Sequence, residues 1–292
     1  GEMPVDAPHK YLMGMFDVST DKLIGCTAVK TCVGVDTPFI NFDLKDDGED
    51  QYLEASSRFR GATEVGSLFL HQDYRADGLG RYLAKVRYHL MASESWRFGD
   101  TVIAELRGIC GAQGSPLYDY MFKDKLEQTF LEADTEYFDR NPDALGNIVP
   151  IGKIPTSSLP VDVRASIGQP HSSGRAAMRL LQGEGFLFTG TIDLFDAGPI
   201  MSVYRDTIRT NMESKIGALC VSDGPLGQDF ILASAGTVGD FRAVVTRGSS
   251  TKSGPVLSPS AAAALDCNTG DPVRYWRAKK RGSHLSIVKA HA

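Results

Sequence analysis

The chain has 292 residues, of which 42% are hydrophobic and 23% charged, and its formal net charge is -5. This composition is typical of a globular enzyme and excludes a disordered or low-complexity chain. The acidic balance argues against a nucleic-acid binder, because neutralising phosphates requires a concentrated basic surface. We find no run of about 18 apolar residues and no signal segment, so we expect a cytoplasmic protein that binds no membrane.

The five cysteines are an odd number, are widely spaced and include no Cys-x-x-Cys pair. This pattern fits neither a disulfide framework nor a zinc site. We therefore expect reduced thiols and no bound metal.

The first third of the chain alternates strand patterns with one helix pattern. Apolar and β-branched runs at Tyr11 to Asp17 and Leu23 to Val35 predict a β-hairpin, and the acidic stretch Asp43 to Glu54 indicates an exposed loop. Strands are predicted at Glu64 to His71 and at Thr101 to Leu106. The helix between them is predicted from apolar residues at helical spacing, which are Leu79, Leu83, Val86, Leu90 and Met91.

The remainder of the chain divides into three parts. We interpret about 108–170 as an inserted lid, because it mixes an aromatic helical piece with a Pro- and Gly-rich stretch. A helix through Ala176 to Leu181 ends at Gly185 and precedes a strand from Phe186 to Phe195. Short strands follow, so we expect a main domain over 1–202 and a small β-rich subdomain over 203–292.

The segment from Leu68 to Arg81 joins a buried strand, a turn and a helix through the pattern Arg-x-x-Gly-x-Gly. The glycines let backbone N–H groups face an anion, and the helix that begins there adds the positive end of its dipole. A tight turn without a ligand is the alternative, because a glycine pair alone is weak evidence. The residues predicted to bind a pyrophosphate are Phe69, Leu70, Arg75, Asp77, Gly78, Leu79, Gly80 and Arg81.

A second helix and strand, from Ala176 to Phe186, carry the pattern Ala-x-x-x-Leu-Leu-x-x-x-Gly-Phe. Together with the turn, it resembles the coenzyme A site of the GCN5-related N-acyltransferases. The chain is also similar to one family, the arginine N-succinyltransferases, from about Tyr11 to Arg277. The matching stretches are Ala28 to Phe42, Glu64 to Ala92, Ala104 to Gly108, Ile167 to His171, Glu184 to Phe186, Asp193 to Pro199 and Ala264 to Arg274.

The resemblance implies an α+β fold with a GCN5-related N-acyltransferase-like mixed sheet flanked by helices. It implies transfer of a succinyl group from succinyl-CoA, as co-substrate rather than tightly bound cofactor, to the α-amine of arginine. Residue spacing alone does not select arginine over ornithine, another amine or another acyl donor. The first strand and helices of that fold would precede Gly1, so the chain is expected to be a fragment or to pair with another piece, as a homo- or hetero-oligomer.

An attacking amine must lose a proton, which requires a base, and the developing oxyanion requires donors. Glu64, at the start of the strand before the turn, is the first candidate base, and a strand-end surface carboxylate is the alternative. Backbone N–H groups around Phe69 and Leu70 are the expected oxyanion donors. His171, on a loop before the second helix, is a candidate for proton transfer or for gripping a carboxylate, and its alternative role is to cap that helix.

Glu105 and Arg107 leave the predicted central strand together, and alternate residues of a strand point the same way. Both could therefore bind the charged ends of an amino acid, and the alternative is a structural ion pair. The acid that protonates the leaving thiolate stays unassigned, with Tyr118 or Tyr120 as substitutes. Because the acidic stretch at Asp43 departs from the family pattern, a non-catalytic amino-acid-binding regulatory subunit is the second hypothesis.

Overall fold

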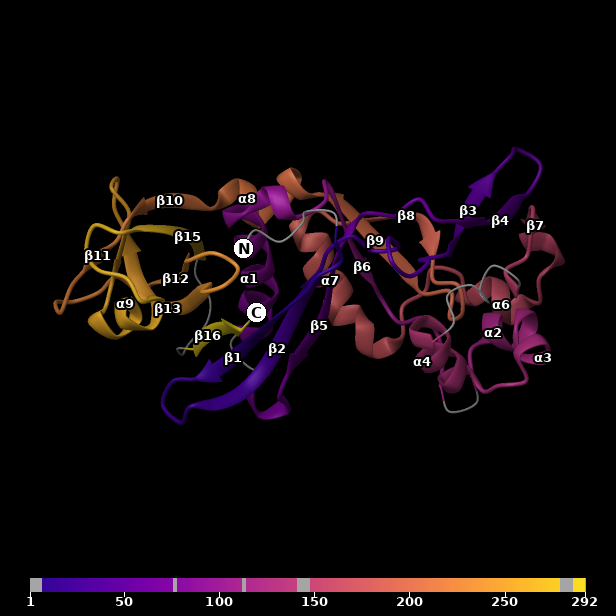
Figure 1. Cartoon of the computed structure of the whole chain (residues 1–292), viewed down its shortest axis with the longest axis horizontal. Coiled ribbons are helices and arrows are strands. Elements are labelled where there is room, and N and C mark those ends of the chain that lie inside the picture. The colour runs from indigo at the N-terminus through magenta and orange to yellow at the C-terminus, as the bar shows by residue number, and fades with distance from the viewer. Residues whose placement is uncertain (1–6, 76–77, 112–113, 141–147, 279–285, 292) are drawn as a thin grey trace. The chain divides into compact units, whose positions relative to one another are not determined.

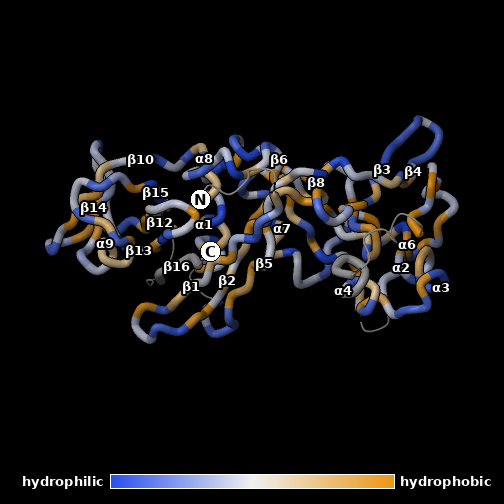
Figure 2. The backbone as a smooth tube through the Cα atoms, in the orientation of Figure 1, coloured by the Kyte–Doolittle hydropathy of each residue, from blue (hydrophilic) through white to orange (hydrophobic). Residues whose placement is uncertain are grey.

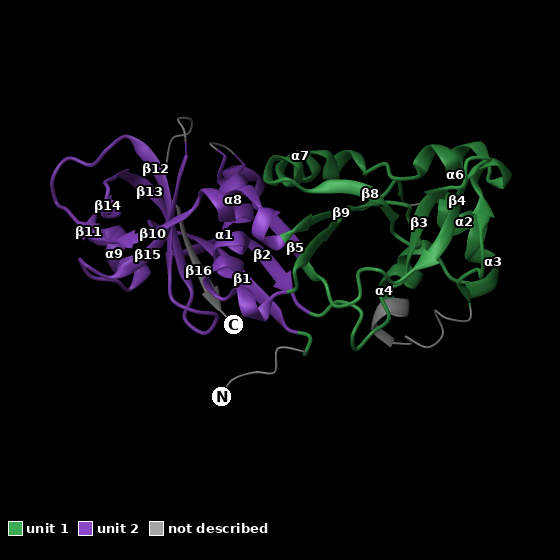
Figure 3. Ribbon diagram, turned by 90° about the horizontal axis from the view of Figure 1, so that it is seen from above, with its two compact units in different colours: residues 1–8, 32–64, 99–204 green, residues 9–31, 65–98, 205–292 purple. Residues whose placement is uncertain are grey.

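The computed structural model describes residues 7–75, 78–111, 114–140, 148–278 and 286–291 (Figure 1). It has the mixed α+β fold that the sequence predicts, and it divides into two compact units (Figure 3). Unit 1 comprises residues 1–8, 32–64 and 99–204, and unit 2 comprises residues 9–31, 65–98 and 205–292. Within the described ranges, no helix combines the length and the apolar character that crossing a bilayer requires.

The strands of unit 2 lie in the order β10, β15, β12, β13, β16, β1, β2 and the last part of β5, and β14 pairs with β11 and β13. Their bounds are Lys10–Asp17 (β1), Lys22–Lys30 (β2), Thr63–Leu70 (β5), Lys215–Ala218 (β10), Cys220–Val221 (β11), Asp229–Ala235 (β12), Arg242–Ser250 (β13), Pro255–Leu257 (β14), Pro272–Ala278 (β15) and Ser286–His291 (β16).

The expected hairpin is confirmed by β1 and β2, which pair in antiparallel register. Alternate residues of β1 are buried, including Met13 and Met15, so one face of the hairpin joins the core. The turn is closed by Asp17, whose carboxylate accepts hydrogen bonds from the backbone N–H and the hydroxyl of Ser19 at 2.9 and 2.7 Å.

The expected helix is confirmed as α1, Leu79–Ser93, but it is buried on its polar side as well. It contacts β2, β12 and α8 (Arg209–Glu213), so neighbours cover more than one side of it. Lys85 is buried and donates from Nζ to the hydroxyl of Thr210 at 2.6 Å. His89 is fully buried, with Nδ1 2.9 Å from the hydroxyl of Ser234. The polar side of α1 is therefore buried against neighbouring elements rather than exposed to solvent.

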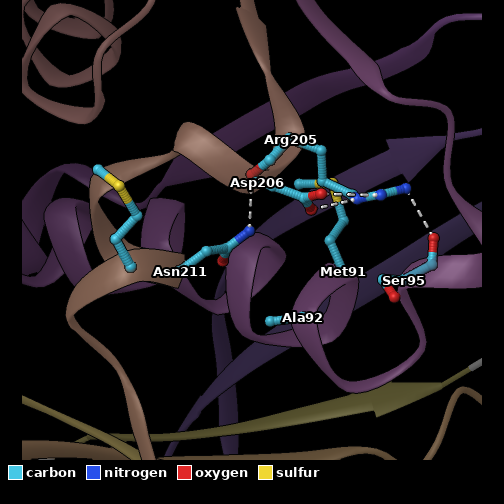
Figure 4. A pocket seen from close by; sticks show the side chains of 7 residues that line it. Met91, Ala92, Ser95, Arg205, Asp206 and Asn211 are labelled. Carbon is cyan, nitrogen blue, oxygen red and sulfur yellow. Dashed lines mark hydrogen bonds and ion pairs between the residues drawn. The ribbon is translucent and has the colours of Figure 1, made fainter.

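A small cavity of about 250 Å³ lies beside the end of α1, and Figure 4 shows the side chains that line it. The guanidinium of Arg205 donates to the carbonyl oxygens of Ser95 and Phe98 at 2.8 and 2.5 Å and to the carboxylate of Asp206 at 2.9 Å. Asn211 donates to the Arg205 carbonyl at 3.1 Å. These contacts satisfy the carbonyls that follow α1, so we regard the arrangement as structural.

The C-terminal part of unit 2 is β-rich, as expected, and has a hydrophobic core of its own. Strands β12 and β13 pair over seven residues and confirm the expected strands there. Helix α9, Pro259–Leu265, packs on β13, and its first turn is capped by the Ser258 hydroxyl, which accepts from the Ala261 N–H at 3.2 Å. The boundary after residue 202 stays a prediction.

The strands of unit 1 lie in the order β5, β6, β9, β8, β3, β4 and β7. The start of β5 pairs with β6 in parallel, with Thr63 beside Val102 and Glu64 beside Ile103. The expected strand before the first helix and the expected central strand are therefore present. The bounds are Asn41–Asp46 (β3), Gln51–Ser56 (β4), Thr101–Glu105 (β6), Ile154–Pro155 (β7), Leu187–Ile192 (β8) and Pro199–Tyr204 (β9).

The expectation of an exposed loop over Asp43 to Glu54 is wrong, because β3 and β4 form an antiparallel hairpin there. Phe42 and Leu53 are fully buried, so their burial outweighs the many charged neighbours. Only the connection between the strands is a hydrophilic turn, which is blue in Figure 2.

The 108–170 region contains helices α2 (Pro116–Met121), α3 (Lys123–Leu126), α4 (Phe130–Arg140) and α6 (Val161–Ser166). Their apolar side chains share one core cluster with Phe42 and Leu53 of the β3–β4 hairpin. Tyr118 is fully buried in this cluster and donates from its hydroxyl to the Gln128 carbonyl at 3.0 Å. It is therefore a core residue rather than a substitute acid, whereas Tyr120 is 51% exposed. The lid interpretation of this region stays a prediction.

The expected second helix is confirmed as α7, Arg175–Glu184, and it ends at Gly185 in the left-handed conformation with φ of 100°. The strand that follows is shorter than expected. Strand β8 ends at Ile192, because Asp193 begins a tight turn that replaces the rest of the expected strand.

Candidate active site

The turn between β5 and α1 has the open backbone that the sequence predicts. Gly78 precedes α1 with φ of 79°, a conformation that favours glycine, and no atom lies within 4 Å of a Cβ built there. A Cβ on Gly80 would meet only a methyl of Leu70, at 3.9 Å. No side chain caps the first turn of α1 among the described residues. Open space therefore coincides with the start of α1, where the Arg81 N–H donates to the Gly78 carbonyl at 2.9 Å and the N–H groups before it have no acceptor within the helix.

The remaining residues of the predicted pyrophosphate turn occupy different settings. Phe69 and Arg81 are exposed, whereas Leu70 and Leu79 are buried. Arg75 is exposed, yet its Nε donates to the Leu70 carbonyl at 2.9 Å and so ties the turn to the end of β5. Asp77 lies outside the described residues.

Strand β5 is irregular just before this turn. Ser67 has φ of 50° within the strand, a conformation that is uncommon for residues other than glycine. Its carbonyl oxygen lies 3.5 Å from the sulfur of Cys26 on β2. An irregularity of this kind in a strand re-aims the backbone groups that follow it, which here belong to Leu68, Phe69 and Leu70.

The end of β6 is held against the turn that begins at Asp193. The Asp193 carboxylate accepts from the N–H groups of Phe195 and Asp196, each at 2.8 Å, and the Asp196 carboxylate accepts from the Gly198 N–H at 2.7 Å. Turns of this kind are built by aspartate side chains that bond to nearby backbone N–H groups. Both carboxylates therefore have fixed positions near Glu105 and Arg107.

Three other carboxyl groups of unit 1, those of Glu64, Asp193 and Asp196, lie within electrostatic reach of Glu105. Glu105 retains accessible surface, but surrounding protein atoms desolvate its carboxyl group, and the charges of Glu64, Asp193 and Asp196 add to the effect, so its pKa is raised well above the ordinary value. Desolvation, and then the charge of Asp196, raises the pKa of Asp193 to about 7. The group therefore favours a bound cation or proton.

Arg107 is the cation that faces this carboxylate group. Its two terminal nitrogens donate to the two oxygens of Asp134, each at 2.8 Å, and one of them also reaches Asp196 at 3.3 Å. The hydrogen bond to Asp134, followed by the nearby acidic charges, raises the pKa of the guanidinium. The alternative of an ion pair, which the sequence left open for Arg107, is thus present, although Asp134 rather than Glu105 is its hydrogen-bonding partner.

His171 lies beside the end of β6, because its backbone N–H donates to the Arg107 carbonyl at 2.7 Å. Its Nδ1 accepts from the N–H of Ser173 at 3.3 Å and lies 2.8 Å from the Ser173 hydroxyl. His171 therefore caps the short 3-10 turn Ser172–Gly174 that precedes α7, whereas α7 itself follows Gly174 without a side-chain cap from the described residues. A neutral imidazole whose Nδ1 accepts an N–H carries its proton on Nε2, so this contact assigns Nε2 as a donor.

Arg107 and His171 both line a cavity of about 1070 Å³ in unit 1, together with residues of α4 and the segment before it. Asp134 and Phe130 of α4 also line it. The Arg107 guanidinium lies 5.7 Å from the centre of the Phe130 ring, within the range of a cation–π contact. The described residues show no cluster of three or more His, Cys, Asp and Glu side chains that could hold a metal ion.

Sequence reasoning missed the roles of Asp134, Asp193 and Asp196 in surrounding Glu105 and Arg107. Asp193 and Asp196 lay within a stretch that matched the family, and the spacing Asp-x-x-Asp before Ala-Gly-Pro was the available signal. Asp134 carried no comparable signal, since it is one of several acidic residues on an exposed helix pattern.

Two family models match the chain. One, described as the arginine N-succinyltransferase beta subunit, matches residues 2–210, and the other, described as the C-terminal domain of that subunit, matches residues 221–277. Arginine N-succinyltransferases of Escherichia coli O139:H28 (strain E24377A / ETEC) and Escherichia coli (strain K12 / DH10B) are each 29% identical over 291 residues, which covers 95% of this chain and 84% of theirs.

A solved structure, that of arginine/ornithine succinyltransferase subunit AI from Pseudomonas aeruginosa, matches with a TM-score of 0.80 and 24% identity. The match covers 94% of this chain and 82% of that one, and it supports the fold. Taken together, these findings define an acyl-transferring enzyme. The chain belongs to the arginine N-succinyltransferase family.

Proposed function

We propose that this chain transfers a succinyl group from succinyl-CoA to the α-amine of L-arginine in arginine catabolism, with ornithine as the second acceptor. The observation that carries the proposal is the carboxylate group of Glu64, Glu105, Asp193 and Asp196, found in a chain of this family. Mutual repulsion of these charges favours a cationic substrate, because a bound cation relieves it.

The turn at Gly78 and Gly80 is the proposed site of the coenzyme pyrophosphate. Its open space and its position at the N-terminus of α1 support this assignment. In the proposal, Arg75 and Arg81 add positive charge there, and Asp77 retains its predicted place in the turn. The coenzyme is a co-substrate that leaves after each turnover.

In the proposed reaction the amine nitrogen attacks the thioester carbonyl carbon and gives up a proton, the C–S bond breaks, and the thiolate takes up a proton. Glu64 is the proposed base, acting directly or through one water. The backbone N–H groups of Phe69 and Leu70 are the proposed oxyanion donors, and the irregularity at Ser67 supports this by re-aiming the end of β5. A cationic acceptor beside Glu105 favours the ionised form of that carboxylate.

His171 fits the role of a donor better than that of a base. Its Nδ1 is occupied by the Ser173 N–H, so the neutral ring presents an Nε2–H group. Such a group can donate a proton or a hydrogen bond to the leaving thiolate or to a carboxylate of the substrate. We propose that it supplies the acid role for which the buried Tyr118 is unsuited.

Glu105 is proposed to contact the cationic part of the acceptor, and Arg107 is proposed to contact its α-carboxylate. For Arg107 this requires that its present partner, Asp134, gives way, because both terminal nitrogens already donate to that carboxylate. Asp196 would stay beside the guanidinium and keep part of its charge compensated.

Two further expectations concern the setting of the enzyme. We propose that it assembles into a homo- or hetero-oligomer, and light scattering of the purified chain, alone and with other family subunits, tests this.

We also propose a cytoplasmic location, which the five free cysteines support because reduced thiols persist in that compartment. Fractionation of the source cells checks the location.

The test of the activity is a panel of acceptors with succinyl-CoA and acetyl-CoA, followed by thiol release and product mass. L-Citrulline is the matched control, since it has the shape of arginine without the charge. We expect arginine to give the highest kcat/KM, ornithine the next and citrulline far less. A neutral amine as the best acceptor would contradict the proposal, and binding of coenzyme A and arginine without turnover would favour the regulatory subunit instead.

A further inference from the structure

The ion pair between Arg107 and Asp134 connects the end of β6 to helix α4 in a geometry that a substrate carboxylate could reproduce. Both terminal nitrogens of Arg107 donate to both oxygens of Asp134, each at 2.8 Å. This fork arrangement is the one in which guanidinium groups bind free carboxylates. Asp134 therefore occupies the position that a carboxylate ligand of Arg107 would take.

The pair differs from a purely structural one in its exposure. The Arg107 side chain is 48% exposed, Asp134 is 21% exposed, and both line the cavity of about 1070 Å³ in unit 1. A carboxylate ligand would re-form with Arg107 the same two hydrogen bonds that Asp134 makes, so the exchange keeps the fork geometry. Because Asp134 retains some exposure, water can replace Arg107 as the hydrogen-bond partner of its carboxylate.

The backbone on both sides of the pair is anchored independently of it. Helix α4 is held by Phe130 and Ala133, which are buried in the core cluster of unit 1, so the exchange requires movement of the Asp134 side chain and not of the helix. Arg107 keeps a second carboxylate, since Asp196 is 2% exposed and lies 3.3 Å away. The backbone just after β6 is fixed by the hydrogen bond from the His171 N–H to the Arg107 carbonyl at 2.7 Å.

We propose that Asp134 determines acceptor specificity by occupying Arg107 until the α-carboxylate of an acceptor replaces it. An amine without a carboxylate cannot make this exchange, so it leaves Arg107 paired with Asp134 and gains nothing from it. Asp134 thus selects α-amino acids over simple amines. This inference rests on the proposed function, because it assigns the acceptor pocket of that reaction.

The experiment compares KM and kcat for L-arginine and for L-arginine methyl ester, which keeps the α-amine and the guanidinium but lacks the free carboxylate. Three single variants are compared, Asp134→Asn, Asp124→Asn and Arg107→Met. The fourth variant combines Arg107→Met with Asp134→Asn. Asp124 is exposed on α3, lies outside the cavity lining, and so controls for the loss of one negative charge in the same region.

Asp134→Asn should lower the KM for arginine by about two- to fivefold, the range that partly exposed ion pairs represent, with little change in kcat. Simple electrostatics predicts the opposite sign, because removing an acidic charge weakens attraction for a cationic acceptor. The KM for the methyl ester should not fall, and Asp124→Asn should not lower either KM. In the Arg107→Met background the Asp134→Asn change should no longer lower the KM for arginine.

A KM for arginine that rises or stays the same in Asp134→Asn, or an equal fall for arginine and its ester, overturns the exchange. A wild-type enzyme that does not succinylate arginine overturns the proposed function instead, so the two failures are distinguishable. For a poorly folding variant, Asp134→Ser gives a second test, since its shorter side chain cannot form the fork with Arg107.

Discussion

Gly198 and Gly108 approach so closely that a Cβ on Gly198 would lie 2.6 Å from the Gly108 backbone nitrogen and 2.1 Å from the Leu106 carbonyl oxygen. This contact joins the end of β6 to the turn that holds Asp196. Gly198→Ala should therefore lower the free energy of unfolding by roughly 1–3 kcal/mol or more, since the backbone on both sides must shift. Urea denaturation followed by circular dichroism measures the change.

Gly183→Ala is the matched control for that substitution. Gly183 lies within α7, and no atom is within 4 Å of a Cβ built there. Replacing it should raise stability by about 0.5–1 kcal/mol, as expected when alanine replaces glycine inside a helix. Equal effects of the two substitutions would contradict the close-approach argument.

Coenzyme binding should depend on the turn before α1. Gly80 has ordinary helical geometry and open space, so Gly80→Val should fold normally while its side chain fills the region where a pyrophosphate would lie. We expect the affinity for coenzyme A to fall by at least about tenfold, because the backbone N–H groups can no longer be approached. Isothermal titration checks this, and Gly78→Val is a second variant whose positive φ adds strain. Unchanged affinity in a folded Gly80→Val protein would exclude the phosphate role of the turn.

Replacing Glu64 by Gln should lower turnover ~10²–10⁴-fold and leave coenzyme affinity intact, if Glu64 removes the proton from the amine. The loss should shrink at high pH, since the acceptor then arrives deprotonated. A residue that only positions the substrate would give a pH-independent loss. The pH profiles of wild type and Glu64→Gln at saturating succinyl-CoA decide between the two roles, and parallel profiles would remove Glu64 as the base.

The substitution Glu64→Gln should also change the pKa of Glu105. The charge of Glu64 is the second cause, after desolvation, of the raised pKa of Glu105. Glu64→Gln should therefore shift the pKa of Glu105 downward, toward its ordinary value. Infrared titration of the carboxyl groups would show the shift, and an unchanged Glu105 signal would mean that the two groups do not interact.

Buried His89 should make the stability of the protein fall in mild acid. Burial, followed by the charges of Arg274 and Lys85, lowers the pKa of His89 to about 3 from an ordinary value of 6.5. Between these values the unfolded chain binds a proton that the folded chain does not, so unfolding is favoured as the pH falls below 6.5. The contribution is about 1 kcal/mol by pH 5.5 and grows toward pH 3.

The comparison that isolates this effect is the pH dependence of the unfolding free energy in wild type and in His89→Gln. The variant should be less stable at pH 7.5, because it disturbs a buried site beside Ser234. Its stability should nevertheless fall less steeply between pH 7 and 5.5. Identical slopes would mean that His89 does not titrate differently in the two states.

Local patterns predicted the elements of the chain better than they predicted its site. The helix from Leu79 was predictable because apolar residues recur at helical spacing, and the hairpin of β1 and β2 because two β-branched runs flank a turn. The hairpin of β3 and β4 was missed because acidic residues outnumber the few apolar ones, although Phe42 and Leu53 anchor it in the core cluster of unit 1.

The candidate site was predictable only where its residues belong to a strand. Glu64 and Glu105 belong to adjacent parallel strands, so their sequence positions placed them. Asp134 and Asp193 come from segments that meet Arg107 and Glu105 through packing of the 108–170 region and of the turn after β8. Such contacts between distant segments carry no periodic signal in a single sequence.

The interleaving of the two units sets an order in which they can form during synthesis. The last segment of unit 1 ends at Tyr204, so every part of that unit has left the ribosome before most of the strands after β9 exist. In unit 2, β1 pairs with β16, so its first strand must wait for its last. The hairpin of β1 and β2 is therefore an early element with an unpaired edge, and nascent chains stalled after residue 204 should expose that edge to chaperones.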